Sequence, residues 1–205
     1  DVAAALVAAA PAQVMLTAGI HAAYLAGQAA LVADGKVGAV ASGAADGAAN
    51  RCVPALYRMR GADLLADPAK AHEIFGAASV VVACDSADEL VAVVAALEGQ
   101  LTATLHCDAA DLGLAQRLLP LLERLAGRIL ANGWPTGVEV THAMVHGGPY
   151  PATSDGRSTS VGTLAIDRFL RPICYQDLPE ALLPAELRGA AAAGLPVRLN
   201  GDRRG

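Results

Sequence analysis

A strand, a cap and a helix follow one another twice in the middle of the chain, and this order constrains the fold more than any other feature. The apolar run from Ser79 to Cys84 predicts a fully buried strand. Asp85 and Ser86 can then cap a helix over residues 87–97, because their side chains accept hydrogen bonds from free N–H groups. The second unit consists of a strand at 101–106, a cap at Asp108, an amphipathic helix at 112–126 and a strand at 128–131. Such alternation predicts an α/β fold with a mostly parallel sheet flanked by helices.

The flanking segments extend this picture. Residues 3–33 are rich in alanine and predict two helices interrupted at Pro11, since proline has no N–H to donate within a helix. Two short β-prone runs, at 37–41 and 52–59, predict neighbouring strands. The stretch from Asn132 to Ser158 holds many glycines and prolines, and its length is typical of a functional loop. A helix from Ser160 to Phe169 and an edge strand from Arg171 to Gln176 are expected after it.

Composition excludes several classes of function. With 54% hydrophobic and 17% charged residues, the chain can bury the core of one domain or slightly more. No apolar run reaches the roughly 18 residues of a membrane span, so we expect no membrane partner. A net charge of -5 with scattered lysines and arginines predicts no nucleic-acid partner. Cys52, Cys84, Cys107 and Cys174 lack CxxC spacing, which predicts free thiols in a cytoplasmic protein.

Four motifs resemble those of a known enzyme family. They are Glu73-Ile74-Phe75-Gly76, the run from Asn132 to Gly137, the run from His146 to Ser154, and the run from Arg168 to Gln176. Together they resemble the C-terminal part of the aldehyde dehydrogenases, and within that family the α-ketoglutaric semialdehyde dehydrogenase branch. The resemblance implies oxidation of an aldehyde, such as a semialdehyde acid, to the carboxylic acid with NAD or NADP as cofactor.

The same resemblance implies what the chain lacks. The family's nucleotide-binding half and its nucleophilic cysteine lie farther upstream than the 72 residues that precede Glu73. We therefore expect a fragment that is inactive alone, with no catalytic residue of its own and the N-terminal half of the parent as a partner. Residues 1–158 would form part of the catalytic domain. Residues 159–205 would supply a helix, an oligomerisation strand and a tail, so we expect a homo-oligomer.

Glu73 and Phe75 are the candidate cofactor-binding residues. A carboxylate can accept two hydroxyl hydrogen bonds from one ribose, and such charge-assisted bonds are strong. In the family that the chain resembles, the matching Glu holds the nicotinamide ribose and the Phe packs beside the same sugar, which implies these roles for Glu73 and Phe75. The alternative is that Glu73 solvates or caps a loop and that Phe75 belongs to the core.

The segment Gly147, Gly148, Pro149 and Tyr150 is the candidate substrate-lining loop. Glycine lets backbone approach a ligand closely, and the segment resembles the family loop that lines the aldehyde tunnel. An ordinary surface turn is the alternative. His142 and His146 are four residues apart with Glu139 nearby, but the segment is poorly helical and lacks the HExxH order, so we expect no metal site.

Two further hypotheses remain open at this point. A non-catalytic assembly or binding module derived from the same fold would also lack the upstream half. An unrelated cysteine enzyme would need one thiol with an activating base or a lowered pKa, and the sequence identifies neither for any of the four cysteines. Buried structural thiols are the simpler interpretation.

Overall fold

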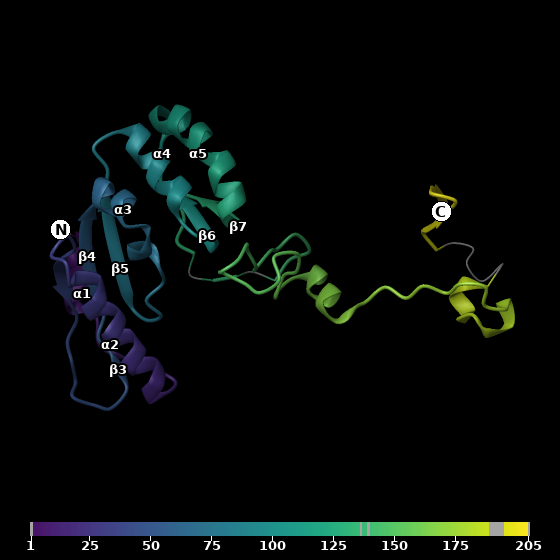
Figure 1. The fold of residues 1–205 in the computed structure, drawn as a ribbon, viewed down its shortest axis with the longest axis horizontal. Helices are drawn as coiled ribbons and strands as arrows, with labels where there is room; N and C mark the ends of the chain where they lie inside the picture. The colour runs from purple at the N-terminus through teal and green to yellow at the C-terminus, as the bar shows by residue number, and fades with distance from the viewer. Residues whose placement is uncertain (1, 136, 139, 189–194, 205) are drawn as a thin grey trace. The chain divides into compact units, whose positions relative to one another are not determined.

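The computed structural model describes residues 2–135, 137–138, 140–188 and 195–204. It divides into two compact units, Asp1–Ala165 and Ile166–Gly205, which are described separately. Within the first unit, strands and helices alternate as the sequence predicts (Figure 1). The domain boundary expected after residue 158 stays a prediction.

The two N-terminal helices form as expected. Helix α1 spans Val2–Ala9 and helix α2 spans Ala18–Val32, with Pro11 between them. Helix α2 begins at Thr17, whose hydroxyl accepts a hydrogen bond from the Ile20 N–H at 3.2 Å. This cap satisfies one of the N–H groups that a helix leaves free at its first turn. Between the helices, strand β1 (Gln13–Val14) pairs antiparallel with β3 (Arg51–Cys52).

A three-stranded sheet has the order β2-β4-β5. Its strands are β2 (Gly38–Ser42), β4 (Ala55–Arg60) and β5 (Ala78–Ala83). The β4–β5 pair is parallel, with Tyr57 opposite Val80, whereas the β2–β4 pair is antiparallel. Helix α3 (Gly61–Ala66) and the 3-10 helix η1 (Pro68–Ala71) connect the two parallel strands. The neighbouring strands predicted at 37–41 and 52–59 are thus confirmed.

The core of this sheet is apolar and is built from several elements. Its buried members come from α2, the segment after it, β4, α3 and α4: Leu31, Val37, Ala55, Tyr57, Met59, Leu64 and Val93. Strand β5 contributes Val80 and Val82 to the same cluster, while Val81 is 46% exposed. The prediction of a fully buried strand at Ser79 to Cys84 is therefore wrong. Strand β5 is an edge strand of this sheet, and only alternate side chains pack on the core.

The second strand and helix unit follows directly. Helix α4 (Ala87–Ala96) begins at Ser86, whose hydroxyl accepts from the Glu89 N–H. Strand β6 (Gln100–Leu105), the 3-10 helix η2 (Ala109–Asp111), helix α5 (Leu112–Leu125) and strand β7 (Ala126–Ala131) complete the unit. Asp108 and Asp111 form a reciprocal capping box, as the expected cap at Asp108 requires. Strands β6 and β7 are parallel.

Helix α5 covers this second parallel pair. Its buried residues Leu118, Leu122 and Leu125 pack with apolar side chains of α4, β6 and β7, and the ribbon shows α4 and α5 side by side (Figure 1). The α/β class is confirmed. The sheets are smaller than a doubly wound sheet, and parallel pairing is confined to β4–β5 and β6–β7 among the described strands.

Asn132, directly after β7, continues the hydrogen bonding between β6 and β7 with its backbone and then with its side chain. The Asn132 N–H donates to the Leu105 carbonyl oxygen at 2.8 Å. The Asn132 side chain then accepts from the Cys107 N–H and donates to the Cys107 carbonyl oxygen, both at 2.9 Å. Asn132 has φ 52°, so the chain leaves the strand here through a left-handed residue.

The long segment after Asn132 contains no α-helix or strand among its described residues. The helix expected from Ser160 to Phe169 is instead a 3-10 helix, η3, at Thr163–Phe169. No described strand pairs with residues 171–176 in the single chain. The edge strand expected there, which the resemblance implies would pair across a subunit interface, stays a prediction. A strand needs a neighbour to satisfy its backbone groups, and alternation alone does not supply one.

The elements described in the second unit are short. The 3-10 helices η4 (Glu180–Leu182) and η5 (Ala185–Leu187) lie close in sequence, and the Arg188 guanidinium donates to the carbonyl oxygens of Leu183 and Ala181. Strands β8 (Val197–Leu199) and β9 (Asp202–Arg204) form an antiparallel hairpin. Asn200 and Gly201, at its turn, both have positive φ, as tight hairpins prefer.

Candidate functional site

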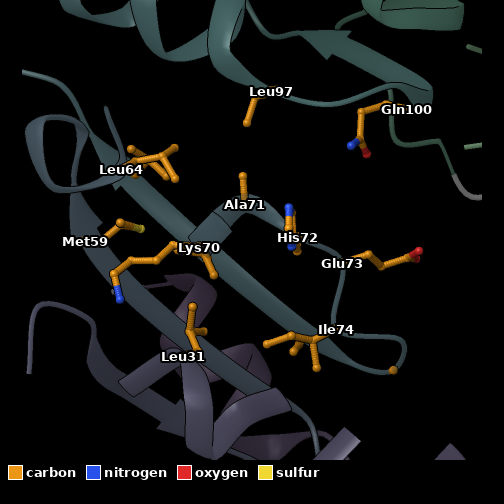
Figure 2. Close-up of a pocket in the computed structure, with 14 residues that line it drawn as sticks. Leu31, Met59, Leu64, Lys70, Ala71, His72, Glu73, Ile74, Leu97 and Gln100 are labelled. Carbon is orange, nitrogen blue, oxygen red and sulfur yellow. The ribbon is translucent and has the colours of Figure 1, made fainter. Parts of the chain in front are cut away.

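Glu73 lies on the segment that joins η1 to β5, and its side chain lines more than one cavity. One cavity of about 410 Å³ is walled by apolar side chains of α2, α3, β4 and β5, with Lys70, His72, Glu73 and Gln100 as its polar lining. Figure 2 shows the Glu73 carboxylate directed away from Ile74, and the Lys70 ammonium directed away from Glu73. The predicted cofactor residue is therefore at the rim of a largely apolar hollow, the usual setting of small-molecule sites.

A second cavity, of about 380 Å³, brings Glu73 to the segment just after the candidate substrate loop. It is lined by Glu73, Glu98, Gly99, Gln100, Leu101, Thr102, Pro151 and Ala152. Residues that are far apart in the sequence thus converge here, from the segment after η1, from the start of β6 and from the loop. Sequence reasoning missed Glu98 and Gln100, and only their position just before a predicted strand could have indicated them.

The Glu73 carboxylate makes no hydrogen bond or ion pair with the described part of the chain. Its neighbour His72 instead pairs with Glu98, with 3.1 Å between Nε2 and Oε1. An exposed carboxylate without an internal partner keeps both oxygens available to accept from the hydroxyls of a ligand. The ribose role that the resemblance implies is chemically compatible with this arrangement.

Phe75 occupies a different place. Its ring is 66% exposed and lines a separate depression of about 220 Å³ with residues of β1 and the start of α2. The core interpretation of Phe75 is therefore wrong, because the side chain points outward. The structure does not bring Glu73 and Phe75 to one cavity, so their joint contact with a single ribose stays a prediction.

The candidate substrate loop is fixed by backbone contacts. Gly147 and Gly148 are buried, Pro149 is half-buried and Tyr150 is 84% exposed; a cis peptide bond joins Tyr150 to Pro151. A Cβ added at Gly147 would lie 2.6 Å from the Ser158 carbonyl oxygen, and one at Gly148 would clash with the Gln100 carbonyl oxygen. These glycines are needed for packing of backbone on backbone.

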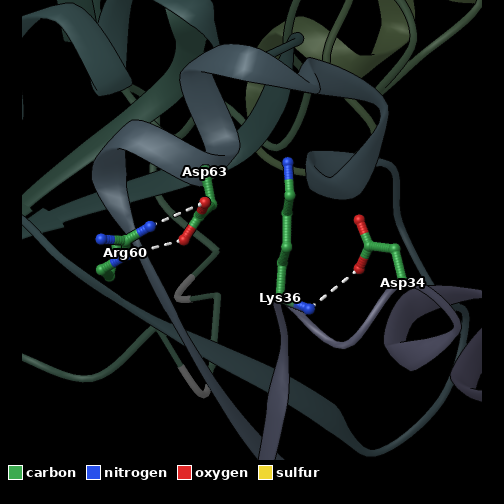
Figure 3. Close-up of polar contacts among 4 residues, drawn as sticks. All are labelled: Asp34, Lys36, Arg60 and Asp63. Atoms are coloured by element: carbon green, nitrogen blue, oxygen red, sulfur yellow. Dashed lines mark hydrogen bonds and ion pairs between the residues drawn. The ribbon is translucent and has the colours of Figure 1, made fainter.

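Lys70 has a structural role at the wall of the larger cavity. Its side chain is 8% exposed, and Nζ lies 2.9 Å from Asp34 Oδ2 and 3.8 Å from Asp67 Oδ2. The bond from Lys70, with a second from the Lys36 N–H at 3.0 Å, lowers the pKa of Asp34 (Figure 3). The same ion pair raises the pKa of Lys70. A lysine held in this way is a positive charge and a poor base.

Arg60 and Asp63 form a second fixed pair near the end of β4. Arg60 Nε donates to Asp63 Oδ2 at 2.8 Å, and Nη2 donates to Oδ1 at 3.1 Å (Figure 3). This bidentate bond lowers the pKa of the nearly buried Asp63 carboxyl. Both groups are occupied by one another, so the pair anchors the start of α3.

The cysteines are free thiols, as predicted. Cys52 is buried, and its Sγ accepts from the Ala77 N–H at 3.1 Å. Burial, followed by the nearby carboxylates of Glu89 and Asp85, raises the pKa of Cys84, which disfavours a reactive thiolate. Cys174 is exposed and Cys107 is partly exposed, so burial of all four thiols was a wrong expectation.

The described residues hold no cluster of three or more metal-ligating side chains. His142 Nδ1 lies 2.6 Å from the Thr163 hydroxyl, and Glu139, the third residue of that motif, lies outside the described residues. Among the described helices, none is long and apolar enough to cross a bilayer.

Comparison with known proteins gives the family that the motifs indicate. The chain is 53% identical, over 95% of its length, to alpha-ketoglutaric semialdehyde dehydrogenase 2 of Azospirillum brasilense, of which it covers 37%. It is 46% identical, over 92% of its length, to alpha-ketoglutaric semialdehyde dehydrogenase of Acinetobacter baylyi, of which it covers 36%. No family model matches the chain. The sequence therefore corresponds to part of an aldehyde dehydrogenase superfamily protein, and it spans a little over a third of these relatives.

Solved structures agree on the fold. The NAD-dependent aldehyde dehydrogenase from Sinorhizobium meliloti matches 76% of the chain with 28% of its own length, at a TM-score of 0.52 and 21% identity. The structure of PnpE in complex with nicotinamide adenine dinucleotide matches 75% of the chain with 29% of its own, at a TM-score of 0.53 and 19% identity. The described α/β arrangement is thus part of the aldehyde dehydrogenase fold.

Proposed function

We propose that this chain forms part of the catalytic domain of an NAD(P)+-dependent aldehyde dehydrogenase that oxidises a semialdehyde acid to the dicarboxylic acid. The relatives' names supply the substrate class, since both are alpha-ketoglutaric semialdehyde dehydrogenases. The observation that carries the proposal is the convergence of Glu73, the start of β6 and the segment after the candidate substrate loop on one cavity of about 380 Å³. Such an enzyme would act in the cytoplasm as a homo-oligomer.

The chain's own residues would bind and orient. Glu73 would accept hydrogen bonds from the nicotinamide ribose, and Phe75 would pack near the cofactor. Gly147, Gly148, Pro149 and Tyr150 would line the aldehyde path. The bound nicotinamide would supply the hydride acceptor. As the family resemblance implies, the nucleophilic cysteine would come from a part of the enzyme outside this sequence. Within the chain, the buried Cys52 and the Cys84 thiol of raised pKa are poor nucleophiles.

Complementation tests this proposal. The chain is assayed for NAD(P)+-dependent oxidation of α-ketoglutaric semialdehyde, first alone and then mixed with a separately produced remainder of the A. brasilense relative. We expect no turnover by the chain alone and measurable NAD(P)H formation in the mixture. Turnover by the chain alone would refute the external nucleophile. An inactive mixture whose parts demonstrably associate would favour the assembly module instead.

A further inference from the structure

Thr159 is buried at the base of the candidate substrate loop, with 4% of its surface exposed. Its hydroxyl oxygen accepts a hydrogen bond from the His146 N–H at 2.8 Å and donates to the Val161 carbonyl oxygen at 2.9 Å. The adjacent Ser160 N–H donates to the His146 carbonyl oxygen at 3.0 Å. Both backbone groups of the residue that precedes Gly147 are therefore held by Thr159 and its neighbour.

A second threonine holds the other end of the glycine pair. The Thr153 hydroxyl donates to the Gly148 carbonyl oxygen at 2.7 Å. Gly147 and Gly148 also press against strand backbone, since a Cβ at Gly127 of β7 would lie 2.7 Å from the Gly147 carbonyl carbon. The side-chain bonds therefore fix the conformation of the loop itself, and the backbone contacts of Gly147 and Gly148 place it against β6 and β7.

The Thr159 hydroxyl positions the loop and does not itself bind a ligand. The Thr159 hydroxyl is already engaged with protein on both its donor and acceptor sides, so it has little capacity to act on a ligand directly. Its bonds are nearly buried, and a buried N–H that loses its acceptor costs more free energy than the bond itself contributes. A loop held in this way keeps its ligand-facing atoms preorganised.

We propose that Thr159 is a positioning residue for the aldehyde: by fixing the backbone of His146 it sets the place of Gly147–Tyr150 and thereby the affinity for the aldehyde. The inference rests on the proposed function, since it assigns the loop to the aldehyde. It adds a residue that touches neither cofactor nor substrate, and that the sequence motifs did not indicate.

The test uses three forms of the chain, wild type, Thr159→Val and Thr159→Ser, each in the complementation mixture. Valine keeps the shape and removes the hydroxyl, whereas serine keeps the hydroxyl. For Thr159→Val we expect KM for the aldehyde to rise by about tenfold or more, since small misplacements of binding groups are costly. KM for NAD(P)+ should stay within about twofold, and Thr159→Ser should restore aldehyde KM.

Hydrogen exchange on the chain alone gives a second readout that does not need turnover. The His146 amide should exchange faster in Thr159→Val than in wild type or in Thr159→Ser, while amides of β4 remain protected. If Thr159→Val does not fold, Thr153→Val replaces it with the same expected rise in aldehyde KM. An active wild-type mixture with unchanged aldehyde KM in the valine variant, or with equal rises for aldehyde and cofactor, overturns the inference. An inactive wild-type mixture instead removes the proposed function, and the aldehyde role of Thr159 with it.

Discussion

The ring of Tyr24 fills the space into which a side chain at Gly76 would project. A Cβ at Gly76 would lie 2.7 Å from Tyr24 Cε2 and nearer still to Cδ2, closer than real Cβ contacts come. Gly76 also has φ 153°, a backbone conformation that side chains rarely adopt. The glycine of the Glu73-Ile74-Phe75-Gly76 motif is therefore explained by packing of helix α2 on the segment that precedes β5.

Gly76→Ala should destabilise the chain by about 2–3 kcal/mol, because the Tyr24 ring and the backbone must both shift. Denaturant unfolding followed by circular dichroism measures the change. The control is Gly113→Ala in α5, where a Cβ meets no atom within 4 Å. That substitution should be neutral or stabilise by up to about 1 kcal/mol, as alanine is the better helix former. Equal effects of the two variants would contradict the packing explanation.

Tyr24→Phe should cost about 1–2 kcal/mol of unfolding free energy. The Tyr24 hydroxyl donates to the Val53 carbonyl oxygen at 2.7 Å and accepts from Gln28 Nε2 at 2.9 Å, and the side chain is 1% exposed. Removal of the hydroxyl leaves the Val53 carbonyl oxygen and Gln28 Nε2 without this hydrogen-bond partner. Tyr150→Phe, at an 84% exposed ring, should stay within about 0.5 kcal/mol and serves as the comparison.

Acid should destabilise the fold partly through Asp63. The bidentate bond from Arg60 lowers the pKa of Asp63, so the ionised form is the one that the folded state favours. Stability from this pair is full above the unfolded pKa of about 4 and is lost as pH falls through the lower folded pKa. Asp63→Asn should lower Tm near neutral pH and give a shallower fall of Tm below about pH 4. Parallel Tm curves for the two proteins in acid would contradict this linkage, with Asp34 accounting for the remaining slope.

Thr104→Val should leave stability unchanged or raise it by about 0.5–1 kcal/mol. The Thr104 hydroxyl on β6 is a buried side-chain oxygen without a hydrogen-bond partner in the described structure. Valine has the same shape, suits a strand and removes the unsatisfied group. Thr104→Ser keeps the hydroxyl and loses the methyl group, so it should destabilise. A lower melting temperature for the valine variant would show that the hydroxyl has a partner in solution.

Glu73→Gln should raise KM for NAD(P)+ by about tenfold in the complementation mixture while aldehyde KM changes little, because a neutral amide is a weaker acceptor for ribose hydroxyls. Glu123→Gln, on the exposed side of α5, is the matched control and should change neither constant. An unaltered cofactor KM in Glu73→Gln would return Glu73 to the role of a solvated loop residue.

The elements that depend on local chemistry were predictable from the sequence. The caps at Ser86 and Asp108, the apolar face of α5 and the interruption at Pro11 each depend on a few neighbouring residues, and all four appear in the structure. Half-exposure of β5 was not predictable, because an apolar run does not reveal which of its faces meets the core. The segment from Arg171 to Gln176 has no partner strand among the described residues, because alternation does not identify the strand that would pair with it.

In the candidate site, too, some residues were predictable from the sequence and others were not. The motif around Glu73 was visible in the sequence, whereas Glu98, Gln100 and Pro151 reach the same cavity only through tertiary folding. The Thr159 hydroxyl was equally hidden, because its bond to the His146 N–H spans 13 residues of irregular chain. A threonine in a glycine-rich loop gives no periodic signal.

The side-chain amide of Asn132 makes the two hydrogen bonds to Cys107 that a backbone peptide group would make at the end of β6 and β7. The last hydrogen bonds of this strand pair are therefore sensitive to deamidation. The residue is followed by Gly133, and Asn-Gly sequences are prone to lose the amide as ammonia. A carboxylate at this position could still accept from the Cys107 N–H, but it would set a negative charge against the Cys107 carbonyl oxygen in place of the Nδ2 donor. Deamidation of Asn132 would therefore remove the hydrogen bond to the Cys107 carbonyl oxygen without changing any apolar contact. The start of the loop that carries the candidate substrate residues would then be held less firmly to the end of β6.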